Sequence, residues 1–240
     1  MDLIIDVGNT FTKLAVFEKN KLIDKKRIET KNCISGIREL QKIHGNLINA
    51  IVSSVGALDN DTLKYVDKEL QILSYKTNLP FKNLYSTPKT LGIDRIALVC
   101  ASVEEFPHNN VLIIDAGTCI TYDFINNKNE YLGGAISPGI RMRYKAMHNQ
   151  TAGLPLLKTE MPKNLIGDST ASSMHSGVVN GVLNEIDGCI TQYLEEYQDL
   201  TVILTGGDAK MLSKQLKSSI FANSNFLLKG LNFILNYNLY

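Results

Sequence analysis

The sequence has no excess of charge of either sign, since its formal net charge is +1, and this argues against broad electrostatic binding of nucleic acid. It has no apolar run of the ~18 residues that a membrane span needs and no signal-peptide pattern at its start, so we expect a cytoplasmic protein without a membrane segment. No CxxC pair occurs, and we expect reduced thiols at Cys33, Cys100, Cys119 and Cys189. With 240 residues, 44% of them hydrophobic, the chain has the composition of one large or two small globular domains.

The stretch Asp6–Lys13 reads D-V-G-N-T-F-T-K between two apolar runs, and this pattern predicts a hairpin with polar groups at its bend. Gly8 permits close approach of the backbone to a ligand, while Asn9, Thr10 and Thr12 add amide and hydroxyl groups. Lys13 carries a charge suited to a phosphate oxygen, and Asp6 is a candidate for holding a hydrated Mg²⁺. Taken alone, the motif favours an ordinary turn between two strands.

A second copy of this motif changes the interpretation. Asp115–Asp123 reads D-A-G-T-C-I-T-Y-D after another apolar run, at an offset of 109 residues (115 − 6) from Asp6. Such an offset is too long for a solenoid repeat and is natural for two duplicated half-domains. We therefore expect half-domains at residues 1–110 and 111–240, whose two acidic bends face each other across a cleft and hold one polyphosphate.

The first half is predicted to run β-β-β-α-β-α-β, with helices joining parallel strands. After the hairpin these elements are a strand at Lys21–Thr30, a helix at Cys33–His44, a strand at Leu47–Val55, a helix at Asp59–Leu70 and a strand at Gln71–Tyr75. A loop containing Tyr85 follows, and Gly92–Arg95 leads into a helix at Ile96–Val103. Asp94 in the first turn complements the helix dipole, but a Gly-Asp-Arg turn beside an aromatic loop also resembles a substrate pocket.

The second half repeats the hairpin and adds a third strand, a glycine-rich turn and several helices. The expected elements are a strand at Glu130–Leu132, a turn at Gly133–Gly139, helices at Ile140–His148 and from Thr170 to about Tyr197, a strand at Thr201–Thr205, and helices at Lys210–Lys217 and Phe226–Tyr237. The glycine-rich turn fits a tight joint and an anion site equally well. Asp168 or Ser169 is expected to cap the long helix, and capping is also the simpler role for Thr170. Glycines inside that helix suggest close packing on another element or another subunit.

Together these motifs resemble the acetate kinase, sugar kinase, Hsp70 and actin superfamily, and within it the type III pantothenate kinase family. The motifs that carry the resemblance are Asp6–Lys13, Gly92–Arg95, Asp115–Asp123, Gly133–Gly139, Gly167–Thr170 and Thr205–Ala209. They span nearly the whole chain, and Gly-x-Asp-Arg is the most discriminating of them. The resemblance implies an α/β fold of two ribonuclease-H-like (actin-like ATPase) halves, each a mixed sheet flanked by helices, with ATP in the cleft.

The resemblance also implies an activity and a set of residue roles. The activity is ATP-dependent phosphorylation of pantothenate to 4′-phosphopantothenate, the first step of coenzyme A synthesis, by a homodimer that needs Mg²⁺ and a monovalent cation, K⁺ or NH₄⁺. Asp94 would be the catalytic base, Asp115 would hold the monovalent cation, and Asp6 would hold Mg²⁺ through water. The implied ATP-binding residues are Asp6, Val7, Gly8, Asn9, Thr10, Phe11, Thr12, Lys13 and Thr118. The implied contacts to pantothenate are Tyr85, Gly92, Ile93, Asp94, Arg95 and Thr170.

Two other functions fit parts of the sequence. One is another small-molecule kinase of the same superfamily, acting on a sugar or on acetate, and the Gly92–Arg95 motif argues against it. The other is a non-catalytic nucleotide-binding relative with a regulatory role. The presence of Asp6, Asp94 and Asp115 together argues against the loss of catalysis, because phosphoryl transfer to an alcohol needs a carboxylate base and electrostatic help at the phosphates.

Overall fold

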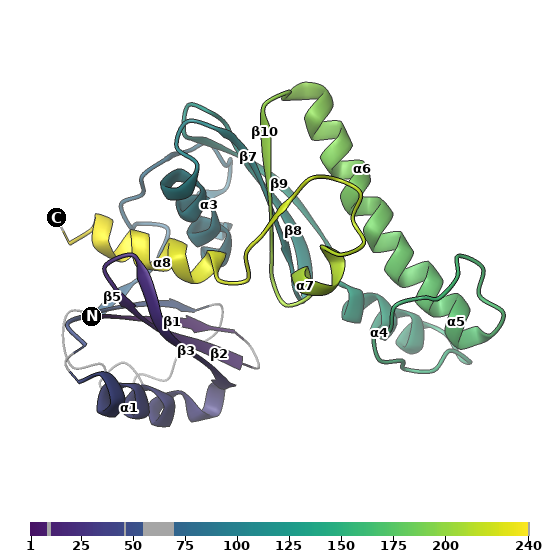
Figure 1. Cartoon of the computed structure of the whole chain (residues 1–240), viewed down its shortest axis with the longest axis horizontal. Helices are drawn as coiled ribbons and strands as arrows, with labels where there is room; N and C mark the ends of the chain where they lie inside the picture. The colour runs from purple at the N-terminus through teal and green to yellow at the C-terminus, as the bar shows by residue number, and fades with distance from the viewer. Residues whose placement is uncertain (9–10, 46, 55–69, 240) are drawn as a thin grey trace. The chain divides into compact units, whose positions relative to one another are not determined.

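The computed structural model describes residues 1–8, 11–45, 47–54 and 70–239 (Figure 1). These residues form an α/β fold with two mixed sheets and flanking helices, as predicted. Their contacts group into two compact units. Unit 1 comprises Met1–His108, Asn129–Tyr131 and Asn225–Tyr240, and unit 2 comprises Asn109–Lys128 and Leu132–Ser224. The expected half-domains at 1–110 and 111–240, which assume an internal duplication, stay a prediction. The C-terminal segment Asn225–Tyr240 makes most of its contacts with unit 1 and is therefore part of that unit.

The sheet of unit 1 has the strand order β3-β2-β1-β4-β5. Its strands are β1 (Asp2–Val7), β2 (Phe11–Glu18), β3 (Lys21–Glu29), β4 (Asn49–Ser54) and β5 (Leu70–Ile72). The first three strands pair antiparallel, whereas β4 and β5 run parallel to β1. The predicted order of these strands is confirmed, although β5 begins and ends earlier than the expected strand at Gln71–Tyr75. The expected helix at Asp59–Leu70 lies outside the described residues up to position 69.

Helices cover both faces of this sheet (Figure 1). Helix α1 (Cys33–His44) begins and ends at the predicted residues and packs Ile37 and Leu40 onto alternate side chains of β1, β2 and β4. On the opposite face, α8 (Phe226–Tyr237) contacts β1 and β4 and crosses α3 (Ile93–Glu105). Helix α8 thus packs on the helix whose first turn carries Asp94.

Gly230 makes the crossing of α8 and α3 possible, because a Cβ at this position would overlap the Ala97 carbonyl. We expect Gly230→Ala to lower the free energy of unfolding by about 1–3 kcal/mol, as overpacking against rigid backbone does. Gly36→Ala in α1 is the matched control, since the atoms nearest to its Cβ would be the side-chain ends of Ile28 and Leu14. That variant should cost less, because those ends can move and alanine favours a helix by about 1 kcal/mol. Urea unfolding of both variants measures the difference, and equal losses would contradict it.

The strands of unit 2 lie in the order β11-β10-β7-β8-β9, and β6 of unit 1 pairs with Glu130–Tyr131 at the start of β9. The strands are β6 (Lys82–Asn83), β7 (Asn110–Ala116), β8 (Cys119–Ile125), β9 (Glu130–Pro138), β10 (Leu200–Thr205) and β11 (Phe221–Ala222). The hairpin β7–β8 and the strand β10 are confirmed.

The expected glycine-rich turn at Gly133–Gly139 is wrong for all but its last residue, because β9 continues to Pro138. Gly133 has a positive φ of 113°, which glycine adopts without strain. A Cβ on Gly134 would overlap the backbone of Tyr122. Gly134 therefore allows the backbone of a neighbouring strand to come close within the sheet. In the sequence alone, a glycine with this role cannot be distinguished from a glycine in a turn.

Helices of unit 2 pack on one face of its sheet (Figure 1). They are α4 (Ile140–Gln150), a continuous helix of α5 (Thr170–His175), a π-helical segment (Ser176–Asn180) and α6 (Gly181–Glu196), and the short α7 (Ala209–Leu212). Ser169 caps α5 in a capping box with Ser172, which confirms one of the two expected caps. The helix expected at Lys210–Lys217 is shorter and begins earlier. In the described part of the chain, every helix is too short or too polar to cross a bilayer.

Candidate active site

The first bend lies between β1 and β2, whose register sets Asp6 opposite Lys13 and Val7 opposite Thr12. The Gly8 amide donates a hydrogen bond to the Phe11 carbonyl at 3.1 Å, and this bond closes the bend. A Cβ on Gly8 would lie 2.9 Å from that carbonyl oxygen, so the turn needs glycine here. Asn9 and Thr10, predicted to bind ATP, lie outside the described residues.

Asp6 and Lys13 form an ion pair at this bend, with 3.2 Å between Nζ and Oδ2. Asp6 is 7% exposed. Burial raises the pKa of the Asp6 carboxyl, the charge and hydrogen bond of Lys13 oppose that rise, and the negative charge of Asp94 adds to it. Burial therefore makes the charged form of Asp6 less favourable, because the carboxylate loses contact with water. The carboxylate of Asp94 is near enough to repel that of Asp6 electrostatically.

The other predicted residues of the bend lie on different sides of the sheet. Val7 is buried in the core beneath α1. The Thr12 hydroxyl donates to the Thr30 hydroxyl at 3.2 Å, and Thr30 in turn donates to the Gly8 carbonyl at 3.0 Å. Because Thr12 is fully buried, its side chain braces the bend from inside, and a direct contact of that side chain with ATP stays a prediction. Phe11 is 39% exposed.

Four polar side chains form one row across the sheet of unit 1. The strand pairings set Arg27 of β3 opposite Lys13, Lys13 opposite Asp6, and Asp6 opposite Ser53 of β4. We call Arg27, Lys13, Asp6 and Ser53 the polar row. Directly paired residues project to the same face of a sheet, so all four belong to one face.

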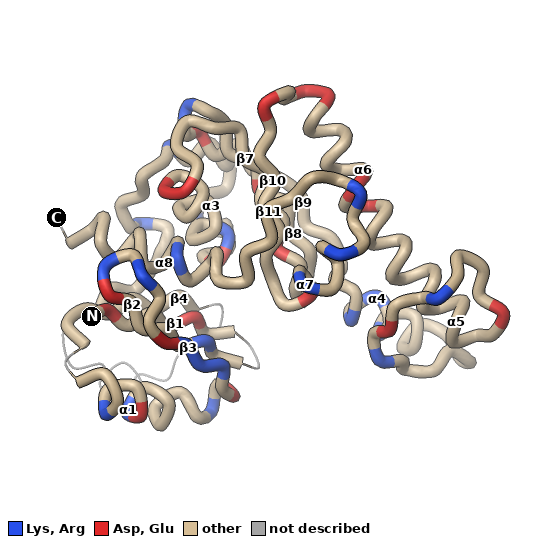
Figure 2. The backbone as a smooth tube through the Cα atoms, viewed as in Figure 1, with Lys and Arg blue, Asp and Glu red and all other residues tan. Residues whose placement is uncertain are grey.

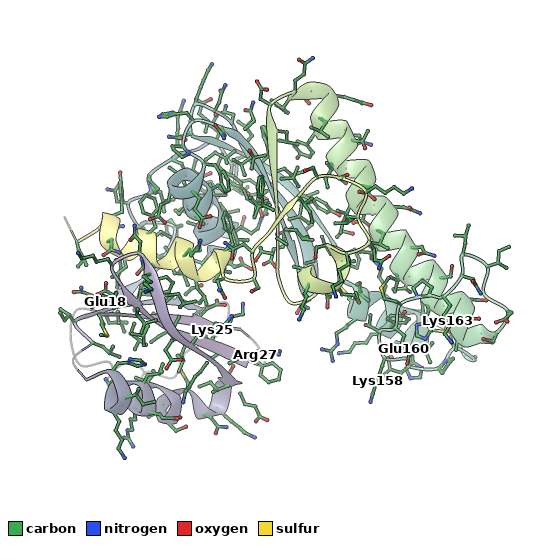
Figure 3. The ribbon with its side chains drawn as sticks, in the orientation of Figure 1. Glu18, Lys25, Arg27, Lys158, Glu160 and Lys163 are labelled. Carbon is green, nitrogen blue, oxygen red and sulfur yellow. The ribbon has the colours of Figure 1, made fainter. Side chains whose placement is uncertain are left out.

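The two ends of the polar row differ. The Arg27 guanidinium lies 3.9 Å from the centre of the Phe11 ring and makes no ion pair with the part of the chain that the structure describes. Figure 3 labels Arg27 and Lys25 on β3, and Figure 2 shows the basic residues along this strand. Ser53 is fully buried, and its hydroxyl has no hydrogen-bond partner among the described residues. Neither residue belongs to a motif singled out in the sequence, although a serine at the carboxyl end of a buried parallel strand is a recognisable signal.

The first turn of α3 presents Asp94. Gly92 is the N-cap residue, and a Cβ there would overlap the Asp94 Oδ1 atom. The same Oδ1 accepts a hydrogen bond from the Arg95 amide at 2.9 Å. Gly92 therefore leaves room for the carboxylate, the backbone orients it, and its second oxygen is available for other chemistry. Ile93, the first helical residue, is half-buried.

Tyr85 and Arg95 pack against each other beside this turn. The Arg95 guanidinium carbon lies 5.6 Å from the centre of the Tyr85 ring, and Tyr85 stacks on Tyr131 with ring centres 6.1 Å apart. Arg95 is 4% exposed, whereas Tyr85 is half-buried. The sequence left open whether Tyr85 faces a ligand or the core. The ring of Tyr85 contacts both the guanidinium of Arg95 and the ring of Tyr131, and the side chain still remains partly exposed.

The second bend, in unit 2, has a similar row. Asp115 of β7 lies opposite Thr121 of β8 on one side and opposite Thr205 of β10 on the other. The Thr121 hydroxyl is buried without a hydrogen-bond partner in the described part of the chain. Gly206, with φ of 98°, brings its turn against the end of β7, where a Cβ would overlap Asp115 and Ala116. Three oxygen-bearing side chains thus meet at one level of the sheet.

Thr118 and Thr170 are the remaining predicted residues of unit 2. Thr118 is exposed at the second bend, where its carbonyl accepts a hydrogen bond from the Gly139 amide at 3.1 Å. Thr170 is the first residue of α5 and lines a cavity of about 580 Å³. The cavity is lined by Met147, Leu154, Gly167, Asp168, Ser169, Thr170, Ser173 and Met174. It mixes apolar and hydroxyl-bearing side chains, as small-molecule sites commonly do.

The structure thus brings together Asp6, Lys13 and Asp94 in unit 1, and Asp115 with Thr121 and Thr205 in unit 2. Among the described residues, no group of three His, Cys, Asp or Glu side chains is placed to hold a metal by itself. The Asp6 carboxylate in unit 1 fits a Mg²⁺ ion that is also bound by phosphate oxygens, because Mg²⁺ is commonly bound through one or two carboxylates, waters and substrate phosphates.

Solved structures with a similar fold include kinases of small molecules. A ROK family glucokinase from Streptomyces griseus, in complex with glucose and AMPPNP, matches with a TM-score of 0.54 at 11% identity over 98% of both chains. A Campylobacter jejuni protein assigned to the Baf family of transcriptional activators matches with a TM-score of 0.66 at 22% identity, over 99% of this chain and 98% of that one. At such identities the likeness shows the fold alone, which is the fold of the actin-like ATPase and sugar kinase class.

Sequence comparison gives the particular family. The family model for type III pantothenate kinase matches residues 2–192. A type III pantothenate kinase from Christiangramia forsetii is 52% identical over 240 residues, which cover 99% of this chain and 99% of that protein. The chain belongs to the type III pantothenate kinase family.

Proposed function

We propose that the chain transfers the γ-phosphoryl group of ATP to the primary hydroxyl of pantothenate, with Asp94 as the catalytic base. As a member of its family, the chain is a kinase that phosphorylates pantothenate in coenzyme A biosynthesis. One observation carries the mechanism: the carboxylate of Asp94 lies near enough to Asp6 for its charge to raise the pKa of Asp6, beside the cation of Lys13. A base and a phosphate-binding charge are thus available at one site.

The transfer needs one proton acceptor and stabilisation of the phosphoryl oxygens. As the hydroxyl oxygen of pantothenate bonds to the γ-phosphorus, its proton passes to Asp94, and the bond from that phosphorus to the bridging oxygen of ADP breaks. The Arg95 amide holds one Asp94 oxygen, so the other oxygen accepts the proton. Lys13 and the backbone N–H groups of the bend Asp6–Lys13 bind the phosphates, and Thr118 adds a contact from the second bend.

The residues of unit 1 also fit a magnesium ion that accompanies ATP. Among the described residues, the buried carboxylate of Asp6 forms an ion pair only with Lys13, and the hydroxyl of Ser53 beside it has no hydrogen-bond partner. When bound, Mg²⁺ neutralises charge that develops on the phosphate oxygens. Asp6 would hold it through water, consistent with the reluctance of Mg²⁺ to lose its hydration shell.

Pantothenate would contact the start of α3 and its aromatic neighbour in unit 1, and Thr170 in unit 2. Gly92, Ile93 and Arg95 frame Asp94, while Tyr85 is held by Arg95 and keeps part of its surface exposed. Thr170 lines a cavity with hydroxyl and apolar groups. This mixture suits a molecule that carries hydroxyl and amide groups as well as methyl groups.

Asp115 would hold the monovalent cation, K⁺ or NH₄⁺. The buried Thr121 hydroxyl, which has no hydrogen-bond partner among the described residues, and the neighbouring Thr205 would supply oxygen ligands at the same level of the sheet. We expect Asp115→Ala to weaken activation by K⁺ by about tenfold or more, since one charged ligand is lost. Activity measured against KCl at constant ionic strength tests this expectation, with NaCl as the balancing salt. An unchanged K⁺ dependence would remove Asp115 from the cation site.

The function is tested by following ADP release in a coupled assay. We expect ATP turnover in the presence of pantothenate, and little with a panel of other hydroxylated acceptors such as glucose, N-acetylmannosamine and glycerol. Turnover with a sugar but not with pantothenate would show that the protein is another small-molecule kinase of the same superfamily. Nucleotide binding without turnover for any acceptor would instead support a regulatory relative.

A homodimer in the cytoplasm is part of the same proposal. Gly177, Gly181 and Gly188 lie in the long helix, and a Cβ at any of them would meet no atom within 4 Å in the described part of the chain. Packing among the described residues therefore does not require these glycines, each of which costs about 1 kcal/mol relative to alanine. That supports the other interpretation of the sequence, packing against a second subunit. Sedimentation velocity of the purified chain measures its oligomeric state.

A further inference from the structure

Ser53 is a buried member of the polar row to which the proposed function assigns no role of its own. Its side chain is fully buried near the carboxyl end of β4, and its Oγ atom has no hydrogen-bond partner among the described residues. A buried hydroxyl left without a partner costs about 1–3 kcal/mol, so such groups are rare unless a ligand or water completes them. The position therefore needs an occupant that can hydrogen-bond.

The face on which Ser53 lies follows from the register of β1 and β4. Asp2 pairs with Asn49, and Asp6 pairs with Ser53, four residues further along both strands. The Asn49 amide donates a hydrogen bond to the Asp2 carboxylate at 2.9 Å, so the side chains of directly paired residues meet on this face. Because side chains alternate with a period of two, Asp6 and Ser53 share the same face. Their intervening neighbours, including Ile5 and Val52, face α1 instead.

The charges around Ser53 decide which kind of group fits beside it. The nearest row member is the Asp6 carboxylate, and the negative charge of Asp94 also acts on Asp6. A phosphate oxygen in that place would be repelled by two carboxylates. A water bound to a cation carries polarised protons and is attracted by them, and it can donate to both Asp6 and the Ser53 oxygen.

The second bend repeats this arrangement of a hydroxyl beside a carboxylate. Thr205 of β10 lies opposite Asp115, as Ser53 of β4 lies opposite Asp6, and in both cases the two strands are parallel neighbours. Thr205 is also buried. A hydroxyl on the parallel neighbour is thus a shared feature of the two bends and independent evidence that Ser53 serves the bend.

We infer that Ser53 is a binding residue for the hydrated magnesium ion of magnesium–ATP, and that it accepts a hydrogen bond from a metal-bound water that Asp6 also holds. This inference rests on the proposed function and deepens it by a residue that none of the sequence motifs includes. The Ser53 proton stays available for a nearby acceptor oxygen. Ser53 thereby contributes to affinity only when the metal is bound, whereas Lys13 interacts with the charge of the phosphates.

The test measures binding, without turnover, of the non-hydrolysable analogue AMPPNP by calorimetry. Each protein is titrated once with excess Mg²⁺ and once with EDTA and no Mg²⁺. For Ser53→Ala we expect affinity in Mg²⁺ to fall by about fivefold to tenfold, the effect of losing one hydrogen bond between a hydroxyl and a water. Without Mg²⁺ its affinity should stay within about twofold of the wild type, because the hydroxyl then has no metal-bound water to hold. Ser53→Cys, which keeps the volume but is a weak hydrogen-bonder, should behave like Ser53→Ala.

Ser102→Ala is the matched control. Ser102 is also a fully buried serine of unit 1, but its hydroxyl donates to the Leu98 carbonyl within α3 at 3.1 Å. We expect its affinity for AMPPNP to be unchanged in both conditions and its melting temperature to fall. Ser53→Ala should instead melt at or above the wild-type temperature without ligand, because it removes an unsatisfied hydroxyl.

The outcomes separate the inference from the proposed function. Equal affinity of Ser53→Ala and the wild type in Mg²⁺ would overturn the inference, as would an equal loss in Mg²⁺ and in EDTA. A lower melting temperature of ligand-free Ser53→Ala would show that the hydroxyl has a structural partner, and would also overturn it. If the wild type binds AMPPNP in neither condition, the proposed function itself fails.

Discussion

Asp94→Asn is expected to lower kcat by about 10²–10⁴-fold, the usual contribution of a general base, while AMPPNP still binds. Asparagine keeps an oxygen that can accept from the Arg95 amide, as Asp94 does at 2.9 Å, so the side chain should keep its orientation. It cannot take a proton from the attacking alcohol. The loss of one negative charge near Asp6 should leave nucleotide affinity unchanged or slightly higher, since Asp94 raises the pKa of Asp6. Steady-state kinetics and calorimetry measure the two effects.

Asp24→Asn is the control for Asp94→Asn. Asp24 belongs to the same unit, but its carboxylate pairs with His44 at the end of α1, at 2.9 Å. We expect normal turnover from this variant. Full turnover by Asp94→Asn would show that the assignment of the base is wrong, and a parallel loss of AMPPNP binding would show that Asp94 acts through the nucleotide site.

Asp6→Asn is expected to move activity and stability in opposite directions. Activity should fall by roughly 10–100-fold, as when a residue that orients a bound metal through water is changed. The pKa of Asp6 is raised above its ordinary value of 3.8, with burial as the largest cause. The folded state therefore binds this proton more tightly than the unfolded state, and the free energy of unfolding falls as pH rises from 3.8 through the raised pKa. Asparagine has no proton to lose, so the ligand-free variant should be at least as stable as the wild type at pH 7.

Urea unfolding of both proteins between pH 4 and pH 7 measures the effect, and the wild type should lose more stability than Asp6→Asn over this range. Asp2→Asn is the matched control, because Asp2 is a second buried carboxyl on the same strand and the same face, 8% exposed and bonded to Asn49. It should keep normal turnover. A marked loss of stability in Asp6→Asn at pH 7 would mean that the ion pair with Lys13 outweighs the desolvation of Asp6.

The elements of the fold could be predicted where a local pattern determines them. The apolar runs beside both acidic bends, the spacing of Ile37 and Leu40 in α1, and the polar cap before α5 each act over a few residues. The glycines of β9 were taken for a turn because a glycine that admits a neighbouring backbone has the same letter as a glycine that turns the chain. The two roles can be distinguished only once the strand beside the glycine is known, and which strand that is depends on how the strands of the sheet pair.

The candidate site could be predicted only in part for a similar reason. Asp6, Asp94 and Asp115 belong to motifs that can be read along the chain. Ser53 and Arg27 join the polar row through strand registers, which bring positions 27 and 53 into line with position 6. No local pattern encodes such an alignment, because it depends on how several strands pair. That the two acidic bends hold one triphosphate stays a prediction.

The two hairpins differ by a single residue at the tip. Val7 pairs with Thr12 across four intervening residues, whereas Ala116 pairs with Ile120 across three. Matching letters would align Thr12 with Thr121, yet Thr12 faces α1 and Thr121 faces the acidic side chain of its own bend. Shortening a hairpin by one position rotates every later side chain to the opposite surface. A shift of register by one position therefore sets a neutral hydroxyl beside Asp115, where Asp6 has the ammonium group of Lys13. This difference supports the proposal that the first bend binds phosphate and the second a monovalent cation.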